Sequence, residues 1–118
     1  MAVVARFKFE VEDVGAGIVD AMNISQAFDE AGGMTSYEVA TGVTDQAMPI
    51  STTTGVTTTQ ALYFRSDQNV TLRQAAADTG LTIRANLPML LTGTAITALL
   101  VSNASGSTAN IRYRVWGT

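Results

Sequence analysis

Six carboxylates lie in stretches whose composition predicts turns, and they are the side chains of this sequence best suited to chemistry. Two carboxylates across a cleft can act as acid and base in glycoside hydrolysis, and a cluster of them can hold calcium. None of the six lies in the dense alternation of acidic residues and Asn around a Gly that a calcium loop uses. Turn and cap chemistry accounts for most of them, because Asp bonds to its own backbone in bends. The six are Asp13, Asp29, Glu30, Asp45, Asp67 and Asp78.

The 118 residues include no histidine and no cysteine. Histidine is the commonest general base near neutral pH, and cysteine thiolates act as nucleophiles and metal ligands. Ser-His-Asp and Cys-His devices, disulfides and thiolate metal sites are therefore impossible in this chain. Two-carboxylate glycosidase chemistry stays open, although so short a chain has little room for a deep cleft. We expect a protein that is not an enzyme, with no catalytic residue, cofactor or metal site.

The polar cluster at 65–69, Arg-Ser-Asp-Gln-Asn, is either a site or a bend between two strands. Apolar residues alternate with others on both sides of it, at 61–65 and again at 70–73. This period of two predicts a β-hairpin with the cluster at its turn. Asp67 and Asn69 suit bends, so we expect a turn rather than a site.

Charge is distributed unevenly along the chain, whose net charge is −3. Eight of the 10 acidic residues lie at or before Asp45, and five of the 7 basic residues, all Arg, lie at or after Arg65. An acidic chain with one lysine, Lys8, lacks the positive field that nucleic-acid binding requires, so we expect no nucleic-acid partner. The opposed charges suit packing between subunits, although scattered surface charge is the simpler interpretation.

Charged residues from Arg6 to Asp13 interrupt any apolar run near the start, so we expect no signal peptide and synthesis in the cytoplasm. The longest apolar stretches, at 87–91 and 98–101, are far too short to cross a bilayer as helices. The sequence therefore predicts no membrane partner.

Short segments of alternating apolar residues recur along the chain and predict seven to nine strands with little helix. This pattern predicts an all-β fold, a single antiparallel β-sandwich domain over 1–118 that resembles a jelly roll; an immunoglobulin-like sandwich or a small barrel is the alternative. The expected strands are 3–11, 18–25, 37–43, 61–65, 70–73, 81–85, 95–103 and 111–116.

Some segments carry more specific expectations. The first strand has one apolar face, with Phe7 and Phe9, which we expect in the core. Residues 25–31 predict either a short helix with Ser25 as its N-cap or a polar loop. An apolar connection is expected at 87–94, followed by a long central strand at 95–103. Pro49 confines 47–51 to an edge or a connection, and the threonine-rich 52–59 predicts a solvent-facing strand or loop.

The last strand offers the best candidate interface. Arg112, Arg114 and Trp116 share one face of it, and Arg and Trp are enriched where proteins bind one another. Tyr63, Tyr113 and Trp116 could instead present an aromatic face to a carbohydrate, although the core or a subunit contact explains most aromatic residues.

The C-terminal half resembles small structural proteins of tailed bacteriophage particles. Three segments carry the resemblance, "ALYFRSDQNVTLR" at 61–73, "LTIRANLPMLLTGTAITALLVSN" at 81–103 and "ASGSTANIRYRVWGT" at 104–118. In that group an extended segment ending in a Ser-Asp turn leads to a Val-Thr-Leu strand, and a strand ending in Ser-Asn precedes a Ser/Gly turn and the last strand.

The resemblance implies a component of the virion. One possibility is a capsid decoration or cement protein, which binds and stabilises the capsid lattice through the major capsid protein or neighbouring subunits. The alternative is a head-tail, tail or fibre-associated module that binds a receptor or carbohydrate. The resemblance also implies a homo-oligomer, with a trimer as the expected form.

Overall fold

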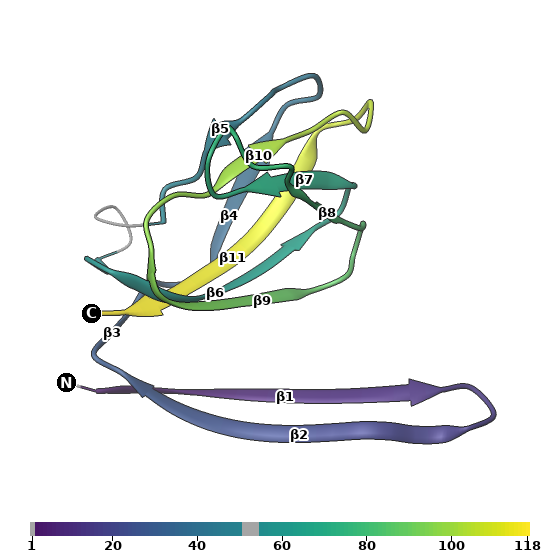
Figure 1. Cartoon of the computed structure of the whole chain (residues 1–118), viewed down its shortest axis with the longest axis vertical. Coiled ribbons are helices and arrows are strands. Elements are labelled where there is room, and N and C mark those ends of the chain that lie inside the picture. The colour runs from purple at the N-terminus through teal and green to yellow at the C-terminus, as the bar shows by residue number, and fades with distance from the viewer. Residues whose placement is uncertain (1, 51–54) are drawn as a thin grey trace.

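The computed structural model describes residues 2–50 and 55–118, and within these ranges the chain forms strands and no helix. The strands belong to three sheets, of which two pack together and the third projects as an arm (Figure 1). The all-β sandwich predicted from alternation is confirmed, while its jelly-roll character stays a prediction.

The globule is built from a five-stranded and a four-stranded sheet. The five-stranded sheet has β11 (Ala109–Gly117) at its centre, paired with β3 (Glu30–Ala31), β4 (Thr35–Val39) and β6 (Thr59–Ser66), and β6 pairs in turn with β9 (Met89–Ile96). The four-stranded sheet has the order β5 (Gln46–Ala47), β10 (Leu100–Ser102), β7 (Val70–Arg73) and β8 (Leu81–Ile83).

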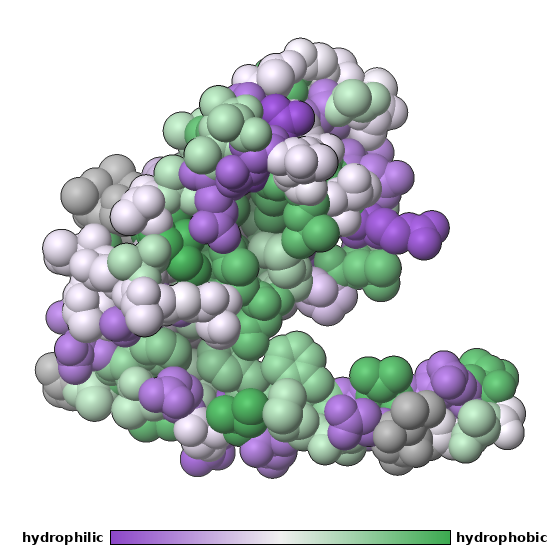
Figure 2. All heavy atoms as spheres, in the orientation of Figure 1, coloured by the Kyte–Doolittle hydropathy of each residue, from purple (hydrophilic) through white to green (hydrophobic). Residues whose placement is uncertain are grey.

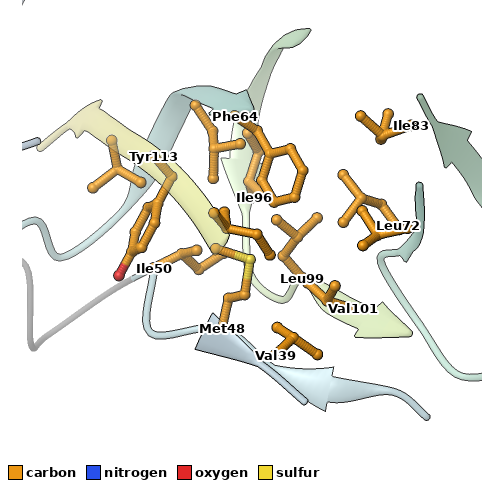
Figure 3. Packing of buried hydrophobic residues seen from close by; sticks show 14 of the residues in the cluster. Val39, Met48, Ile50, Phe64, Leu72, Ile83, Ile96, Leu99, Val101 and Tyr113 are labelled. Carbon is orange, nitrogen blue, oxygen red and sulfur yellow. The ribbon is translucent and has the colours of Figure 1, made fainter. Parts of the chain in front are cut away.

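The core lies between these two sheets and collects the inward-facing residues of both. In Figure 3, Phe64 and Tyr113 come from the five-stranded sheet, and Leu72 and Ile83 come from the other. The buried phenol of Tyr113 donates a hydrogen bond to the Pro49 carbonyl (3.0 Å), so its one polar atom has a partner. Burial raises the pKa of Tyr113, and the neighbouring phenol of Tyr37 raises it further.

The arm is the hairpin of β1 (Val3–Asp13) and β2 (Gly17–Phe28), which pair only with each other. Alternation along β1 is as predicted, but the expectation that its apolar face is core is wrong for the distal half. Phe9 is 42% exposed and Val11 is 54% exposed, because the arm leaves the globule beyond its base. A period of two identifies the apolar face of a strand and says nothing about what covers it.

Neither the helix nor the polar loop predicted for 25–31 forms. The arm continues as strand to Phe28, with Gln26 and Ala27 in register against Ala5 and Val4, and β3 follows at once. Phe28 packs against the globule, and this tertiary contact together with the ladder outweighs a local preference for helix.

The hairpin predicted for 61–73 is also wrong, although both of its strands exist. β6 pairs with β9 and β11, whereas β7 pairs with β8 and β10, so the bend at 65–69 carries the chain from one sheet to the other. Alternation on both sides of a turn predicts two strands but does not specify their partners.

The segment from 87 to 103 divides differently from the prediction. The expected connection at 87–94 contains most of β9 (Met89–Ile96), which follows Pro88, an acceptable residue before a strand. The expected long strand at 95–103 is broken at 97–99, where the chain crosses between sheets and buries Leu99, so only β10 is central.

The remaining boundaries differ less. The strand predicted at 37–43 is β4, which starts earlier and ends at Val39, before a turn that includes Gly42 at a φ of 82°. In the segment at 47–51, Ala47 belongs to the edge strand β5 and 48–50 form a connection, in agreement with the constraint from Pro49, while residue 51 lies outside the described residues. The threonine-rich stretch lies partly outside the described residues. In its described part Thr57 is exposed, as predicted, whereas Val56 and Thr59 are buried.

We expect Leu72→Ala to lower the free energy of unfolding by about 2–5 kcal/mol, because the side chain is buried in the core and its loss leaves a cavity. Leu87→Ala is the matched control: Leu87 is exposed, and the same substitution should change stability by less than about 0.5 kcal/mol. Urea denaturation of both variants measures the difference, and equal effects would contradict this description of the core.

Candidate interaction surface

Trp116 lies at the junction between the arm and the globule. Its ring meets Phe7 edge to face at a centroid separation of 5.3 Å and meets Phe28 at 6.3 Å, and it is only 8% exposed. Ala5 of the arm and Ala61 of β6 complete the buried cluster, which we call the junction. The aromatic contacts therefore fasten the base of the arm to the sheet.

The three residues of the candidate interface do share one face of β11, and they differ in what they contact. Trp116 is covered by the arm of its own chain. The Nε of Arg114 donates a hydrogen bond to the Gly32 carbonyl (2.9 Å), and its guanidinium lies 5.4 Å from the centre of the Trp116 ring. Arg112 is exposed, so of the three it is the most accessible to another molecule.

Arg112 lies opposite Arg65 of β6 on the outer face of the five-stranded sheet, which faces away from the core. Both side chains are exposed, and like charges directly opposite each other on a sheet repel. Within the described ranges the one ion pair joins Arg73 to Asp45 (3.3 Å), so neither arginine is neutralised by a carboxylate of this chain. The outer face therefore carries a basic pair that an acidic partner would stabilise.

The distal half of the arm is a second unusual surface. The face of the arm that carries Phe7 and Phe28 at the junction continues along this distal half. There it carries four exposed apolar side chains, Phe9, Val11, Met22 and Ile24. Where the arm diverges from the globule, apolar surface extends over both sides of the angle between them (Figure 2). A hollow of about 270 Å³ lies in this angle, and we call it the notch; it is lined by Phe7 and Phe9 of the arm and by Tyr63, Pro88, Met89 and Leu90 of the globule, together with Arg6 and Lys8.

The sequence analysis missed the arm, because it predicted strands at 3–11 and 18–25 and no hairpin longer than the rest of the fold. The observed strands have 11 and 12 residues, about twice the usual length of a strand in a globular protein. A hairpin that long extends beyond a sandwich whose other strands have at most 9 residues.

The polar cluster at 65–69 forms a bend held by hydrogen bonds to other segments. The carboxylate of Asp67 accepts bonds from the backbone N–H of Asn110 (2.7 Å) and from its side-chain amide (2.9 Å). The side-chain oxygen of Asn69 accepts from the Ala85 N–H (2.8 Å), and the Ser66 hydroxyl accepts from the Gln68 N–H (3.2 Å). These contacts agree with the prediction that the cluster is a turn.

The pKa of Asp67 lies below its ordinary value of 3.8. The largest cause is the hydrogen bond from the side chain of Asn110, followed by the bond from the Asn110 backbone, while partial desolvation acts in the opposite direction.

Two other carboxylates have structural partners as well. Asp45 forms an ion pair with Arg73 and accepts a hydrogen bond from the Ser102 hydroxyl (3.3 Å). Asp78 accepts hydrogen bonds from the backbone N–H groups of Gln74 and Ala75 and so caps its loop. Over residues 2–50 and 55–118, no three acidic side chains gather where they could hold a metal ion. Among four hollows found on this part of the chain, one is lined by a carboxylate, that of Glu10, and none is lined by two.

The aromatic face suggested by Tyr63, Tyr113 and Trp116 is not formed. Tyr113 is 1% exposed and points into the core, whereas Trp116 lies on the opposite side of β11 beneath the arm. The two tyrosines and the tryptophan therefore do not make one platform for a sugar ring.

Searches of protein-family models, of curated proteins and of solved structures found nothing that matches this chain. In the part of the chain that the structure describes, no helix is long and apolar enough to span a membrane. The surface features of the molecule are consequently the basis for proposing its function.

We expect Phe7→Ala to increase acrylamide quenching of tryptophan fluorescence, because it removes the ring that packs on Trp116. Trp116 is the only tryptophan, so the emission reports on the junction. Phe9→Ala is the matched control, since it removes the same side chain from an exposed position farther along β1. Equal quenching in both variants and the parent, measured in dilute protein, would show that Phe7 does not hold the junction closed.

Asp67 should make a pH-dependent contribution to stability. Because folding lowers its pKa, the ionised carboxylate stabilises the protein above about pH 3.8, and this contribution is lost as the pH falls through the lower pKa of the folded state. We expect the difference in Tm between the parent and Asp67→Asn to be largest near neutral pH and to shrink on acidification. Thermal denaturation from about pH 7 to about pH 2 measures it, and a constant difference would contradict the assignment.

Proposed function

We propose that this chain is a non-enzymatic structural protein of a bacteriophage virion, and specifically a capsid decoration or cement protein that binds and stabilises the capsid lattice. Its partners in this role are the major capsid protein or neighbouring virion subunits. The observation that carries the proposal is the arm, whose distal half presents Phe9, Val11, Met22 and Ile24 to solvent on one face, with Asp20 opposite Val11 at its end.

An exposed apolar face on a long hairpin has a physical cost unless something covers it. Isolated two-stranded hairpins are marginally stable in water, and open strand edges invite association. A protein that acts alone would gain by shortening such an arm, whereas a subunit of an assembly gains contact area from it. A cementing role requires contact area on a rigid fold and does not require a pocket.

The rest of the chain is consistent with this role. The sandwich provides a closed core that supports the arm, and the basic pair Arg65 and Arg112 adds a charged surface on the outer face of the five-stranded sheet. The resemblance of the C-terminal half to phage structural proteins points to the same class. The trimer that the resemblance implies stays a prediction.

The alternative, a tail- or fibre-associated module that binds a receptor or carbohydrate, has less support. Its aromatic motivation is weakened because Tyr113 is buried in the core. The loop carboxylates that motivated it, such as Asp67 and Asp78, accept hydrogen bonds from their own chain.

The proposed function predicts that the full chain co-sediments with undecorated capsid shells of the phage that encodes it. Already decorated shells are the control, because their binding sites are filled and should retain much less added protein. We also expect bound protein to raise the temperature at which the shells rupture. No binding to undecorated shells would overturn the proposal, and binding to host-cell glycans in its place would favour the alternative.

A further inference from the structure

The notch and the distal arm have complementary surfaces that the single chain leaves unused. The arm and the outer face of the five-stranded sheet meet at the junction and diverge toward the tip of the arm (Figures 1 and 2). One side of the notch is the apolar face of the arm, with Phe9, and the other is the outer face of the sheet, with Tyr63 and Leu90. A partner that fits the notch must therefore present apolar side chains to the arm.

We propose that the notch receives the arm of a second copy of this chain, and that the two copies engage reciprocally about a two-fold axis. The inference names the partner of the arm, and the two-fold pair takes the place of the trimer that the resemblance implies. It rests on the proposed function only in the claim that the arm is covered in an assembly.

Reciprocity follows from the shape of the molecule. The arm of each chain forms one wall of that chain's notch. When the arm of a second chain enters the notch of the first, the notch of the second chain therefore encloses the arm of the first. The apolar faces of the two arms then lie against each other, with Phe9, Val11, Met22 and Ile24 of each copy covered. The contact uses the same surfaces on both copies and closes after two, as isologous interfaces do.

The tip of the arm suits the bottom of the notch. The turn at 14–17 reads Val-Gly-Ala-Gly, and the side chain of Val14 is fully exposed to solvent. In the reciprocal pair the arms run antiparallel, so each tip points toward the partner's junction. An apolar tip there would lie against Tyr63 and Leu90, which line the notch.

The charges also match. Glu10 and Glu12 alternate with the apolar residues of β1, so they lie on the face of the arm opposite to Phe9 and Val11. In the reciprocal pair this face of the arm is directed toward the outer face of the partner's five-stranded sheet. That sheet face carries Arg65 and Arg112, which have no carboxylate partner within the described residues of their own chain.

The distances along the strands agree with this pairing. Glu12 lies two residues from Val14, and Arg65 lies two residues from Tyr63, so a tip at Tyr63 brings the carboxylates near the arginines. From Glu10 to Asn23 the arm carries acidic residues and no basic ones, whereas Arg6 and Lys8 lie nearer its base. The tip of the arm is therefore acidic, and it enters a notch whose lining includes Arg6 and Lys8.

The test is the mass of the full chain in solution, measured by light scattering across a concentration series. We expect a dimer of twice the 12.4 kDa chain mass that dissociates more readily as salt is added. Phe9→Ser should weaken the dimer at least ten-fold, while Leu81→Ser, which replaces an exposed apolar residue of β8, should leave it unchanged. A monomer, a trimer, or equal effects of the two substitutions would overturn the reciprocal pair.

A charge exchange tests the register of the contact. The double variant Glu10→Lys/Glu12→Lys sets basic arms against basic sheet faces, and Arg65→Glu/Arg112→Glu sets acidic arms against acidic faces. We expect each to be monomeric alone and an equimolar mixture to form dimers, because each arm then meets a sheet face of opposite charge. Two variants that stay dimeric alone, or that stay monomeric when mixed, would overturn the pairing.

The outcome separates this inference from the proposed function. A parent chain that is monomeric in solution but co-sediments with undecorated shells overturns the reciprocal pair and leaves the cementing role standing. A chain that is dimeric in solution but does not bind undecorated shells overturns the cementing role and leaves the reciprocal pair standing.

Discussion

The packing of Trp116 against Phe7 and Phe28 is the contact on which the shape of the molecule depends. It anchors both strands of the arm to the five-stranded sheet, through Phe7 of β1 and Phe28 of β2, while Ala5 and Ala61 complete the buried cluster around the indole. Without this anchor the hairpin would be a two-stranded ribbon of marginal stability. With it, the base of the arm is fixed and the distal half extends outward, so one buried aromatic cluster defines both the arm and the notch.

The globule, in contrast, satisfies most of its own buried polar groups; among the described residues, the buried side-chain nitrogen without a hydrogen-bond partner is the Nε of Arg73. The buried amide of Asn103 donates to the Val39 carbonyl (2.9 Å) and the Ser107 carbonyl (2.8 Å), and its oxygen accepts from Ser105. Asp67 and Asn110 join the bend after β6 to the start of β11 in a similar way. The sandwich therefore closes its core without a partner. The surfaces best suited to contact with another molecule are the apolar face of the arm, the notch and the basic pair.

Much of the fold was predictable from local patterns, and the errors share a cause. Alternation located the strands around Phe64, Leu72 and Ile111, and turn composition located the bend at 65–69. The hairpin at 61–73 was wrong because pairing depends on residues far away in the chain: β6 finds β9 and β11. The helix at 25–31 was wrong because the ladder with β1 and the burial of Phe28 outweigh local propensity.

The sequence by itself determined the chemistry and the class of fold. The absence of histidine and cysteine limits the reactions available, and the period of two specifies strands with apolar faces. Only the tertiary structure decided which apolar faces are buried. Phe7 and Phe9 occupy equivalent positions in the same pattern, yet Phe7 packs on Trp116 and Phe9 faces solvent. Alternation encodes the direction of a side chain relative to its strand, whereas burial depends on where the rest of the chain lies.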